Sequence, residues 1–498
     1  MTFLFLGLSS PRHPNNFPLY CLLHLKPEKE TMQAVRKRWR DKGGYRQVLV
    51  IATPLILSTG AWSVQHFVDR MFLSWYSPEA IAAAMPAGMM SFAVMSFFLG
   101  TATYVSTFVA QYFGAKRFDR IGPALWQGVY IALVGGFVLL CFIPFADAIF
   151  SFMGHDPLVQ RYEVPYFQVL CLGGFPFVAS SALSGFFTGR GKPWAVMWVN
   201  TCATIVNLVL DYALIFGVWG FPELGIKGAA IATVLSGAFS FCVYLTLISR
   251  KGYNEKYHTL KGWRPERELF MRLVRFGSPS GVQFFLEMVG FTVFILLVGR
   301  LGTNALAATN IAFNINTLAF MPMIGCGIAV SVLVGQYLGS NKPALAQKSA
   351  YSGFHMTVLY MATIAAAYVL VPDIFVAPFA AKAHPESMAE IYHLAVILLR
   401  FVAVYSVFDT MNIIFASAIK GAGDTRFVMF MILILSALIL VLPAYIAIVI
   451  LGYGLTIAWG IGTIYVITLG FVFYLRFRGE KWKSMRVIEH PVMDGEPA

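Results

Sequence analysis

Long apolar runs, each about the length of a membrane helix, alternate with short polar segments along almost the whole chain. The run at 431–451, MILILSALILVLPAYIAIVIL, is apolar on every face. A bilayer-spanning helix needs ~20 apolar residues, whereas an outer-membrane strand alternates polar and apolar positions over ~10 residues. The pattern therefore predicts an all-α integral membrane protein and excludes a β-barrel. Twelve spans are predicted, at residues 47–75, 84–113, 125–150, 162–189, 194–218, 228–249, 276–299, 307–338, 348–372, 391–418, 427–450 and 454–476.

Composition and charge support this prediction. Hydrophobic residues make up 58% of the chain and charged residues only 12%, about half the charged fraction of a soluble domain. This balance excludes a cytosolic enzyme and a disordered protein. The net charge is +13, but its distribution indicates topology rather than nucleic-acid binding. With the N-terminus inside, the inner segments hold 28 Lys and Arg residues and the outer loops hold 4. This bias predicts a multi-pass inner-membrane protein with both termini in the cytoplasm.

The chain contains an internal repeat. The segment STFVAQYFGAK (106–116) resembles VSVLVGQYLGS (330–340), with Gln111 matching Gln336 at an offset of 225, and GRGKP (189–193) resembles GAGDT (421–425) at an offset of 232. The twelve helices are therefore predicted to form two homologous halves. An even number of spans in each half makes these parallel six-helix repeats, related by an axis along the membrane normal. Two such lobes with a site between them are typical of transporters.

The predicted organisation follows from the spans and the repeat. It comprises an N-terminal cytoplasmic tail (1–45), a first lobe with helices 1–6 (46–250), a cytoplasmic inter-lobe loop (251–275), a second lobe with helices 7–12 (276–476) and a cytoplasmic C-terminal tail (477–498). Within the first tail, prolines interrupt the apolar start, and the basic stretch after Met32 leads directly into the first span. We expect residues 1–31 to be an upstream artefact or a disordered tail. The sequence leaves open whether translation starts at Met1 or Met32.

Four acidic residues lie well inside predicted spans, away from the span ends. They are Asp69 in span 1, Asp211 in span 5, Glu287 in span 7 and Asp409 in span 10, which gives one pair in each half. Ionisable residues in a membrane span are costly and functional by default. Helical spacing of three or four residues places polar partners on the same faces. These partners are Gln65 and His66 for Asp69, Asn207 for Asp211, Gln283 for Glu287, and Tyr405 and Asn412 for Asp409.

Oxygen-rich acid pairs of this kind suit a small cation. Carboxylate, amide and hydroxyl oxygens fit Na⁺, and buried paired carboxyl groups also fit H⁺. We therefore expect a coupling ion, Na⁺ or H⁺, and no other cofactor. The alternative interpretation gives these acids a structural role, such as capping a kink or pairing with a buried base. The cysteines form no C-x-x-C pair, so no structural metal site is predicted.

Several motifs around these acids resemble one family. They are VDRMFLSWYSPEAIAA after Pro54, the loop VAQYFGAKR, NLVLDYALIFG followed by PELGIKGAAIAT, FFLEMVGF in span 7, and YSVFDTMNIIFASAIKGAGDT in span 10. The chain resembles the multidrug and toxic compound extrusion (MATE) family over about 46–476, and Glu287 and Asp409 indicate its NorM-type branch. The resemblance implies two six-helix lobes in a V. It also implies a cation-coupled antiporter that exports organic cations and drugs across the inner membrane by alternating access.

The resemblance also implies roles for individual residues. The residues matching Glu287, Asp409 and Tyr405 form the cation site of the second lobe, a potential Na⁺ site, and the acid matching Asp69 is the functional acid of the first lobe. Asp211 departs from the NorM-type pattern, in which Asn is more usual here. Other MATE branches have Asp at this position, paired with an Asn four residues earlier, here Asn207. Both lobes are thus equipped to bind an ion, so the ion and the lobe that couples it stay open. Supporting roles are expected for Gln283, Gln65 and Asn412.

Two other classes of function fit the sequence less well. A lipid-linked oligosaccharide flippase of the related superfamily would require Arg or Lys lining its cleft, whereas the charges within these spans are mostly acidic. A membrane enzyme or receptor has no support from a catalytic triad, a metal motif or a soluble domain. The sequence therefore predicts a transporter rather than an enzyme. Its expected partners are lipophilic cations or drugs and membrane lipid, without nucleic acid, and the protein is expected to be a monomer.

Overall fold

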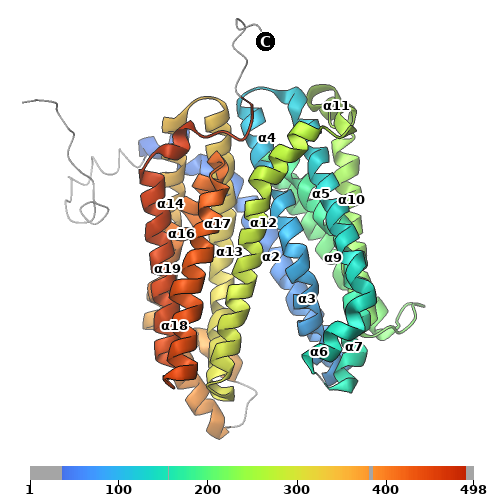
Figure 1. Ribbon diagram of the computed structural model, residues 1–498, viewed down its shortest axis with the longest axis vertical. Helices are drawn as coiled ribbons and strands as arrows, with labels where there is room; N and C mark the ends of the chain where they lie inside the picture. Colours follow the sequence, from blue (N-terminus) through green and yellow to red (C-terminus); the bar gives the residue numbers. More distant parts are fainter. Residues whose placement is uncertain (1–35, 155, 381–384, 490–498) are drawn as a thin grey trace, which may run out of the picture.

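The protein is a bundle of long helices joined by short loops (Figure 1). The computed structural model describes residues 36–154, 156–380 and 385–489, so the prediction for residues 1–31 lies outside the described residues. Within the described part, 11 helices are long and apolar enough to cross a membrane, or up to 12 if one bent pair is a single span. The predicted all-α membrane fold is confirmed.

The first half of the chain forms the bundle drawn from blue to green in Figure 1. Its helices are α2 (Tyr45–Tyr76), α3 (Pro78–Thr103), α4 (Val105–Gly114), α5 (Ile121–Phe142), α6 (Ala146–Met153), α7 (Pro157–Leu172), α8 (Gly174–Gly189), α9 (Trp194–Phe216) and α10 (Ile226–Ile248). A short helix, α11 (Lys251–Tyr257), and a 3₁₀ turn at Lys261–Trp263 follow in the inter-lobe segment.

The second half forms the bundle drawn from yellow to red. Its helices are α12 (Arg267–Gly299), α13 (Thr303–Gly339), α14 (Pro343–Leu370), α15 (Pro372–Ala380), α16 (Pro385–Ala422), α17 (Thr425–Leu435), α18 (Leu442–Tyr445) and α19 (Leu455–Arg478). Between α17 and Ile450 the backbone includes two π-helical stretches, Ser436–Val441 and Ile446–Ile450. A 3₁₀ turn at Lys481–Ser484 follows α19.

Two predicted boundaries differ from the structure. The span predicted at 162–189 is a bent pair, because α7 and α8 meet at Gly173 with an angle of 44°. Two successive glycines, followed by a proline that lacks an N–H group, weaken the helix there. In addition, α12 begins at Arg267, inside the predicted loop 251–275. Its extra turns are charged on one side, but Leu269 and Leu273 are buried on the other, and this apolar stripe stabilises the helix.

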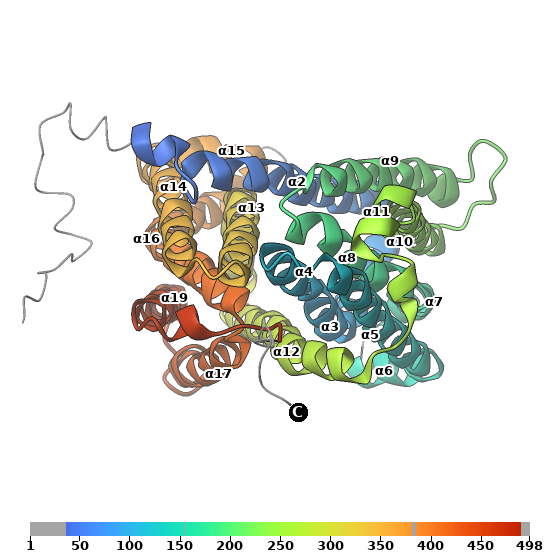
Figure 2. The same ribbon diagram turned by 90° about the horizontal axis from the view of Figure 1, so that it is seen from above.

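The two bundles lie side by side when seen from above (Figure 2), and two helices connect them. Helix α2 packs against α9 of its own half and against α13 of the other, and α12 packs against α17 and against α3 in the same way. The first turns of these two helices lie in the core of the opposite half. Val48 and Ile51 of α2 join the apolar cluster of the second half, and Leu273 of α12 joins that of the first. The halves are therefore joined at the end where α2 and α12 begin.

Candidate cation sites and the contact between the halves

The two acids of the first half face each other from neighbouring helices. Asp69 lies on α2, and Asn207 and Asp211 lie fully buried on α9. With its amide nitrogen toward the acids, Asn207 is 3.1 Å from Oδ1 of Asp69 and 3.1 Å from Oδ2 of Asp211. The two carboxyl groups are also close enough to interact directly, and a hydrogen bond between them requires a proton on one of the two. A single amide therefore bridges a close pair of carboxyl groups.

Further polar groups surround this pair. Nε2 of Gln65 is 3.0 Å from the Asn207 amide, so the predicted supporting residue does lie in the site. Tyr166 on α7 lies near both carboxyl groups. Its role was not predicted, because α7 carries no pattern that shows which residue faces α2. The other predicted neighbour, His66, packs its ring edge-on against Trp62, with ring centroids 4.7 Å apart.

One carboxyl oxygen of this site has no hydrogen-bond donor. Oδ1 of Asp211 is shielded from solvent and has no hydrogen-bond partner in the described part of the chain. A buried acceptor without a donor is costly, whereas a proton or a small cation beside it removes that cost. The geometry of the first half therefore suits the binding of a positive charge.

The two acids of the second half each have an amide partner on their own helix. Gln283 donates through Nε2 to Oε1 of Glu287 at 2.9 Å, and Asn412 donates through Nδ2 to Oδ1 of Asp409 at 2.8 Å. Both predicted amide partners are therefore in contact with their acids. Among the described residues, no hydrogen bond joins Glu287 directly to Asp409. Asp409 is only 7% exposed, whereas Glu287 lies on an exposed face of α12.

Tyr405 contacts a residue that was not predicted. Its hydroxyl accepts a hydrogen bond of 3.1 Å from Nδ2 of Asn316 on α13. Tyr465 on α19 lies near both Glu287 and Asp409. No sequence pattern points to these two residues, because they come from helices without an acid of their own among those predicted. Together they add an amide and a phenol to the second site.

A further buried acid was also missed. Glu163 on α7 is completely buried, and it stands next to the first residue of the predicted span 162–189. The described helix begins earlier, at Pro157, which moves Glu163 into the folded interior. An error of a few residues in the predicted start of a helix therefore matters most when a polar residue lies close to that start.

The repeated sequence motifs meet across the contact between the halves. Gln111 on α4 donates through Nε2 to the carbonyl oxygen of Gly421 at 3.0 Å. Gln336 on α13, at the matching position of the repeat, donates to the carbonyl oxygen of Gly189 at 2.8 Å. Each half thus contributes one glutamine side chain and one glycine carbonyl. The repeat produces a reciprocal pair of contacts.

This contact requires glycine at two matching positions. A Cβ atom at Gly114 would lie 2.0 Å from the backbone oxygen of Gln336, and one at Gly339 would lie 2.1 Å from that of Gln111. Such distances are far below any allowed contact, so only glycine lets the α4 and α13 backbones approach this closely. The two halves are therefore in direct backbone contact at this end.

The two related bundles, with buried acids in each, define a multi-pass membrane protein of the two-lobed transporter class. The comparison with known families agrees with this class. Residues 54–213 and again 279–446 match the MatE family, one match in each half. The chain belongs to the multidrug and toxic compound extrusion (MATE) family.

Individual relatives support this assignment. A probable multidrug resistance protein NorM of Bradyrhizobium diazoefficiens is 29% identical over 76% of this chain and 81% of its own length. Another of Thermotoga maritima is 25% identical over 76% of this chain and 80% of its own length. Among solved structures, a MOP superfamily transporter from Pyrococcus furiosus superposes with a TM-score of 0.80 at 20% identity, covering 90% of this chain and 98% of that chain. The two NorM relatives are thus named for multidrug resistance, and the solved structure shares the fold.

Proposed function

We propose that the protein is a cation-coupled antiporter, driven by Na⁺ or H⁺, which exports organic cations and other drugs by alternating access. We place it in the inner membrane with both termini in the cytoplasm, because of the distribution of basic residues along the chain. The observation that carries the proposal is the bridged carboxyl pair, Asp69 and Asp211, inside an otherwise apolar bundle.

The carboxyl pair supports coupling for an electrostatic reason. Two carboxyl groups in contact repel each other when both are ionised, unless a proton or a metal cation lies between them. Loading a cation therefore stabilises the contact between α2 and α9, and losing it destabilises that contact. Since α2 also packs against α13 of the second half, ion binding in the first half can change how the halves fit together. The cation then binds one conformation of the two halves more tightly than the other, and this difference in affinity shifts the balance between them.

The shape of the interface supports alternating access. Helices α3 and α12 lie close together toward the end where the C-terminus lies and diverge toward the other end (Figure 1). The reciprocal contacts of Gln111 and Gln336 join the halves at the C-terminal end. With the basic loops in the cytoplasm, this arrangement is the outward-open conformation. A solved MATE transporter described as outward-facing superposes with a TM-score of 0.80 at 19% identity.

Apolar residues on the facing helices support a lipophilic substrate. Met85 and Met89 are exposed on α3, and Phe285 is exposed on α12. Methionine adapts to ligands of different shape. Phe92 of α3 and Phe284 of α12 also meet across the two halves, with ring centroids 5.8 Å apart. An aromatic surface beside carboxyl groups suits a lipophilic cation, because aromatic faces attract positive charge.

Purified protein in lipid vesicles tests the proposal. Transport of a fluorescent lipophilic cation is measured with a Na⁺ gradient alone, with an H⁺ gradient alone, and with neither. We expect one gradient to drive transport against the substrate gradient, and Asp69→Asn to lower that transport about tenfold or more. Asp147→Asn, an exposed acid on α6, is the matched control and should transport normally. Gradient-independent transport by the wild-type protein would reject coupling, and transport of a lipid-linked sugar instead would support the flippase.

A further inference from the structure

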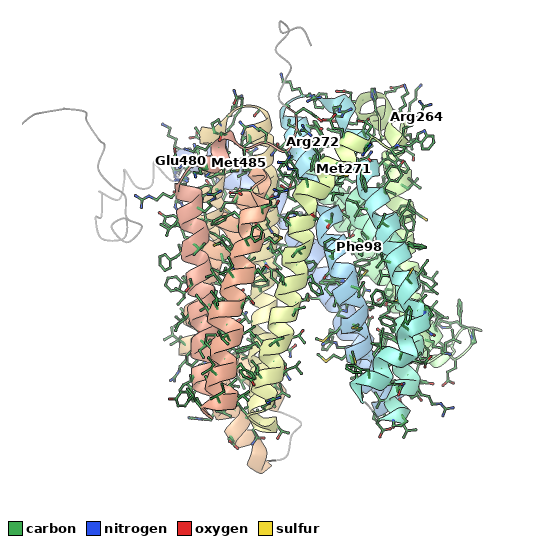
Figure 3. All side chains as sticks on the ribbon, viewed as in Figure 1. Phe98, Arg264, Met271, Arg272, Glu480 and Met485 are labelled. Carbon is green, nitrogen blue, oxygen red and sulfur yellow. The ribbon has the colours of Figure 1, made fainter. Side chains whose placement is uncertain are left out.

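The chain that follows α19 crosses from the second half to the first. It leaves the second bundle after the 3₁₀ turn and runs over the end of the molecule, where Figure 2 shows it above the boundary between the bundles. We call residues 485–489 the C-terminal strap. In Figure 3, Glu480 and Met485 mark its start, and Arg272 on α12 lies beyond them toward the first half. The strap therefore connects the two halves at the end where they are in contact.

The turn that leads into the strap is fixed to the second half. Trp482 is 1% exposed and belongs to the apolar cluster of the second half. Its ring stacks on Phe477 of α19 with centroids 4.7 Å apart, and its Nε1 donates to the carbonyl oxygen of Phe477 at 2.7 Å. This anchor moves with the second half, because both partners belong to α19 or directly follow it.

The end of the strap is fixed to the first half. Val487 and Ile488 belong to the apolar cluster of the first half. Glu489 forms an ion pair of 2.9 Å with Arg117 and one of 3.7 Å with Arg120, and the Tyr112 hydroxyl donates to its carboxylate at 3.0 Å. Charge-assisted hydrogen bonds of this kind are the stronger ones in proteins.

The strap also joins the reciprocal contact described above. The backbone N–H of Val487 donates to Oε1 of Gln111 at 2.9 Å. The other end of the same amide, Nε2, donates to the carbonyl oxygen of Gly421. One side chain thus holds both the strap and the opposite half. Arg272 of α12 adds a hydrogen bond of 3.3 Å to the carbonyl oxygen of Val487.

We propose that the C-terminal strap holds the two halves together at this end and must detach from the first half before this end of the transporter can open. Separation of the halves moves Trp482 with one half and the Glu489 site with the other. The short strap, anchored at both ends, opposes that movement. The proposal rests on the proposed alternating access for its functional meaning, but its structural prediction can be measured without transport.

The strap is engaged at neutral pH. Partial burial raises the pKa of Glu489, but hydrogen bonds and the arginine charges outweigh burial and leave it below the ordinary value. A lowered pKa in the attached state gives stability that is present above the ordinary pKa and is lost only as the pH falls through the lowered value. The strap should therefore stay attached between about pH 6 and 8. The groups that face Glu489 are Tyr112, Arg117, Arg120 and Arg272, and two of these arginines also pair with Glu266 and Glu268.

Two truncations and two substitutions test the proposal. The chain ending at Arg486 lacks the end of the strap, and the chain ending at Glu489 is its matched control. Glu489→Gln removes only the charge, and Glu480→Gln is its control, because Glu480 pairs with Lys483 in the turn before the strap. Each change is made in a cysteine-free background with spin labels at Lys251→Cys and Lys342→Cys, two exposed positions in different halves. The distance between the labels reports separation at this end.

The expected result is a shift toward longer distances. The chain ending at Arg486 and Glu489→Gln should raise the ratio of separated to joined molecules about tenfold, the scale of a lost charged hydrogen bond. Both controls should match the full chain. Identical distance distributions in the chains ending at Arg486 and Glu489 would overturn the proposal. If the chain ending at Arg486 unfolds at a lower temperature than the chain ending at Glu489, the test rests on the distance distribution of Glu489→Gln alone. If the distance shift is observed but no gradient drives transport, the proposed function is rejected. The proposed role of the strap in joining the halves still stands in that case.

Discussion

The acid sites of the two halves differ in how their carboxyl groups are held. In the first half, Asn207 bridges Asp69 and Asp211, and the two carboxyl groups are in contact. In the second half, Glu287 and Asp409 each have their own amide partner, Gln283 and Asn412. The helices and motifs repeat between the halves, but the polar groups do not. A duplicated scaffold has thus kept its backbone contacts while its two acid pairs have taken different arrangements.

This difference has a physical consequence. In the first half, one added cation is shared by two carboxyl groups. Its loss therefore changes the interactions of both helices that carry them, α2 and α9. In the second half, a cation near one acid acts on the other acid only by electrostatic interaction through space. The reason is that each acid is hydrogen-bonded within its own helix, α12 or α16. We therefore expect the first half to carry most of the coupling between ion and substrate, and the second half to modulate it.

The largest expected effect is that of Asp69→Asn. Removing this charge should lower gradient-driven export about tenfold or more, the scale of a lost coupling free energy, because the bridged pair then loses its site for a cation. Glu287→Gln should lower export less, by about threefold. Both are measured as initial rates in vesicles at equal protein insertion. If Glu287→Gln is the more damaging change, coupling resides in the second half.

The next effect concerns whether the free-energy changes of two substitutions in one site add up. A double-mutant cycle of Asp69→Asn and Asp211→Asn should show an interaction of about 1–3 kcal/mol in the free energy of unfolding, since the two groups are in contact. The cycle of Glu287→Gln and Asp409→Asn should give less than about 0.5 kcal/mol, because these groups act separately. Denaturation of the purified protein in detergent supplies the free energies. Equal interaction energies in both cycles would remove the distinction between the two sites.

Some parts of this difference could be predicted from the sequence, and others could not. Contacts within one helix, such as Gln283 with Glu287 and Asn412 with Asp409, follow from a spacing of four or three residues. Contacts between helices depend on how each helix is rotated about its axis, and a helix that is apolar all round gives no signal of that rotation. This is why Asn316 and Tyr166 were missed.

The fold was more accessible than the sites for a related reason. Apolar length fixes where a helix can cross the membrane, and the repeat fixes how many helices each half contains. Gly114 and Gly339 repeat at an offset of 225, and the structure shows that they lie at matching places in the contact between the halves. The sequence could not show that the partners of these glycines come from the opposite half, because a repeat contains no information about distances between its copies.

A smaller effect is expected from the amides. Asn207→Ala removes a donor shared by two carboxyl groups and should lower the free energy of unfolding by about 2 kcal/mol, whereas Asn412→Ala removes a donor to one carboxyl and should cost about 1 kcal/mol. Thermal unfolding of both variants against the wild-type protein measures the difference. A larger loss of stability in Asn412→Ala than in Asn207→Ala would contradict the difference described between the acid sites of the two halves.

The smallest effect is expected from Tyr405→Phe. The Tyr405 hydroxyl accepts a hydrogen bond from Asn316 at 3.1 Å, so its loss leaves one half-buried amide donor without this partner and should cost about 1 kcal/mol of stability. Because this donor already occupies one side of the oxygen, we expect the concentration of coupling cation that gives half-maximal export to change by less than about twofold. Asn316→Ala is the matched variant, since it frees the same oxygen. A large rise in the half-maximal cation concentration for Tyr405→Phe, with stability unchanged, would instead make the hydroxyl a direct cation ligand and the second half a binding site in its own right.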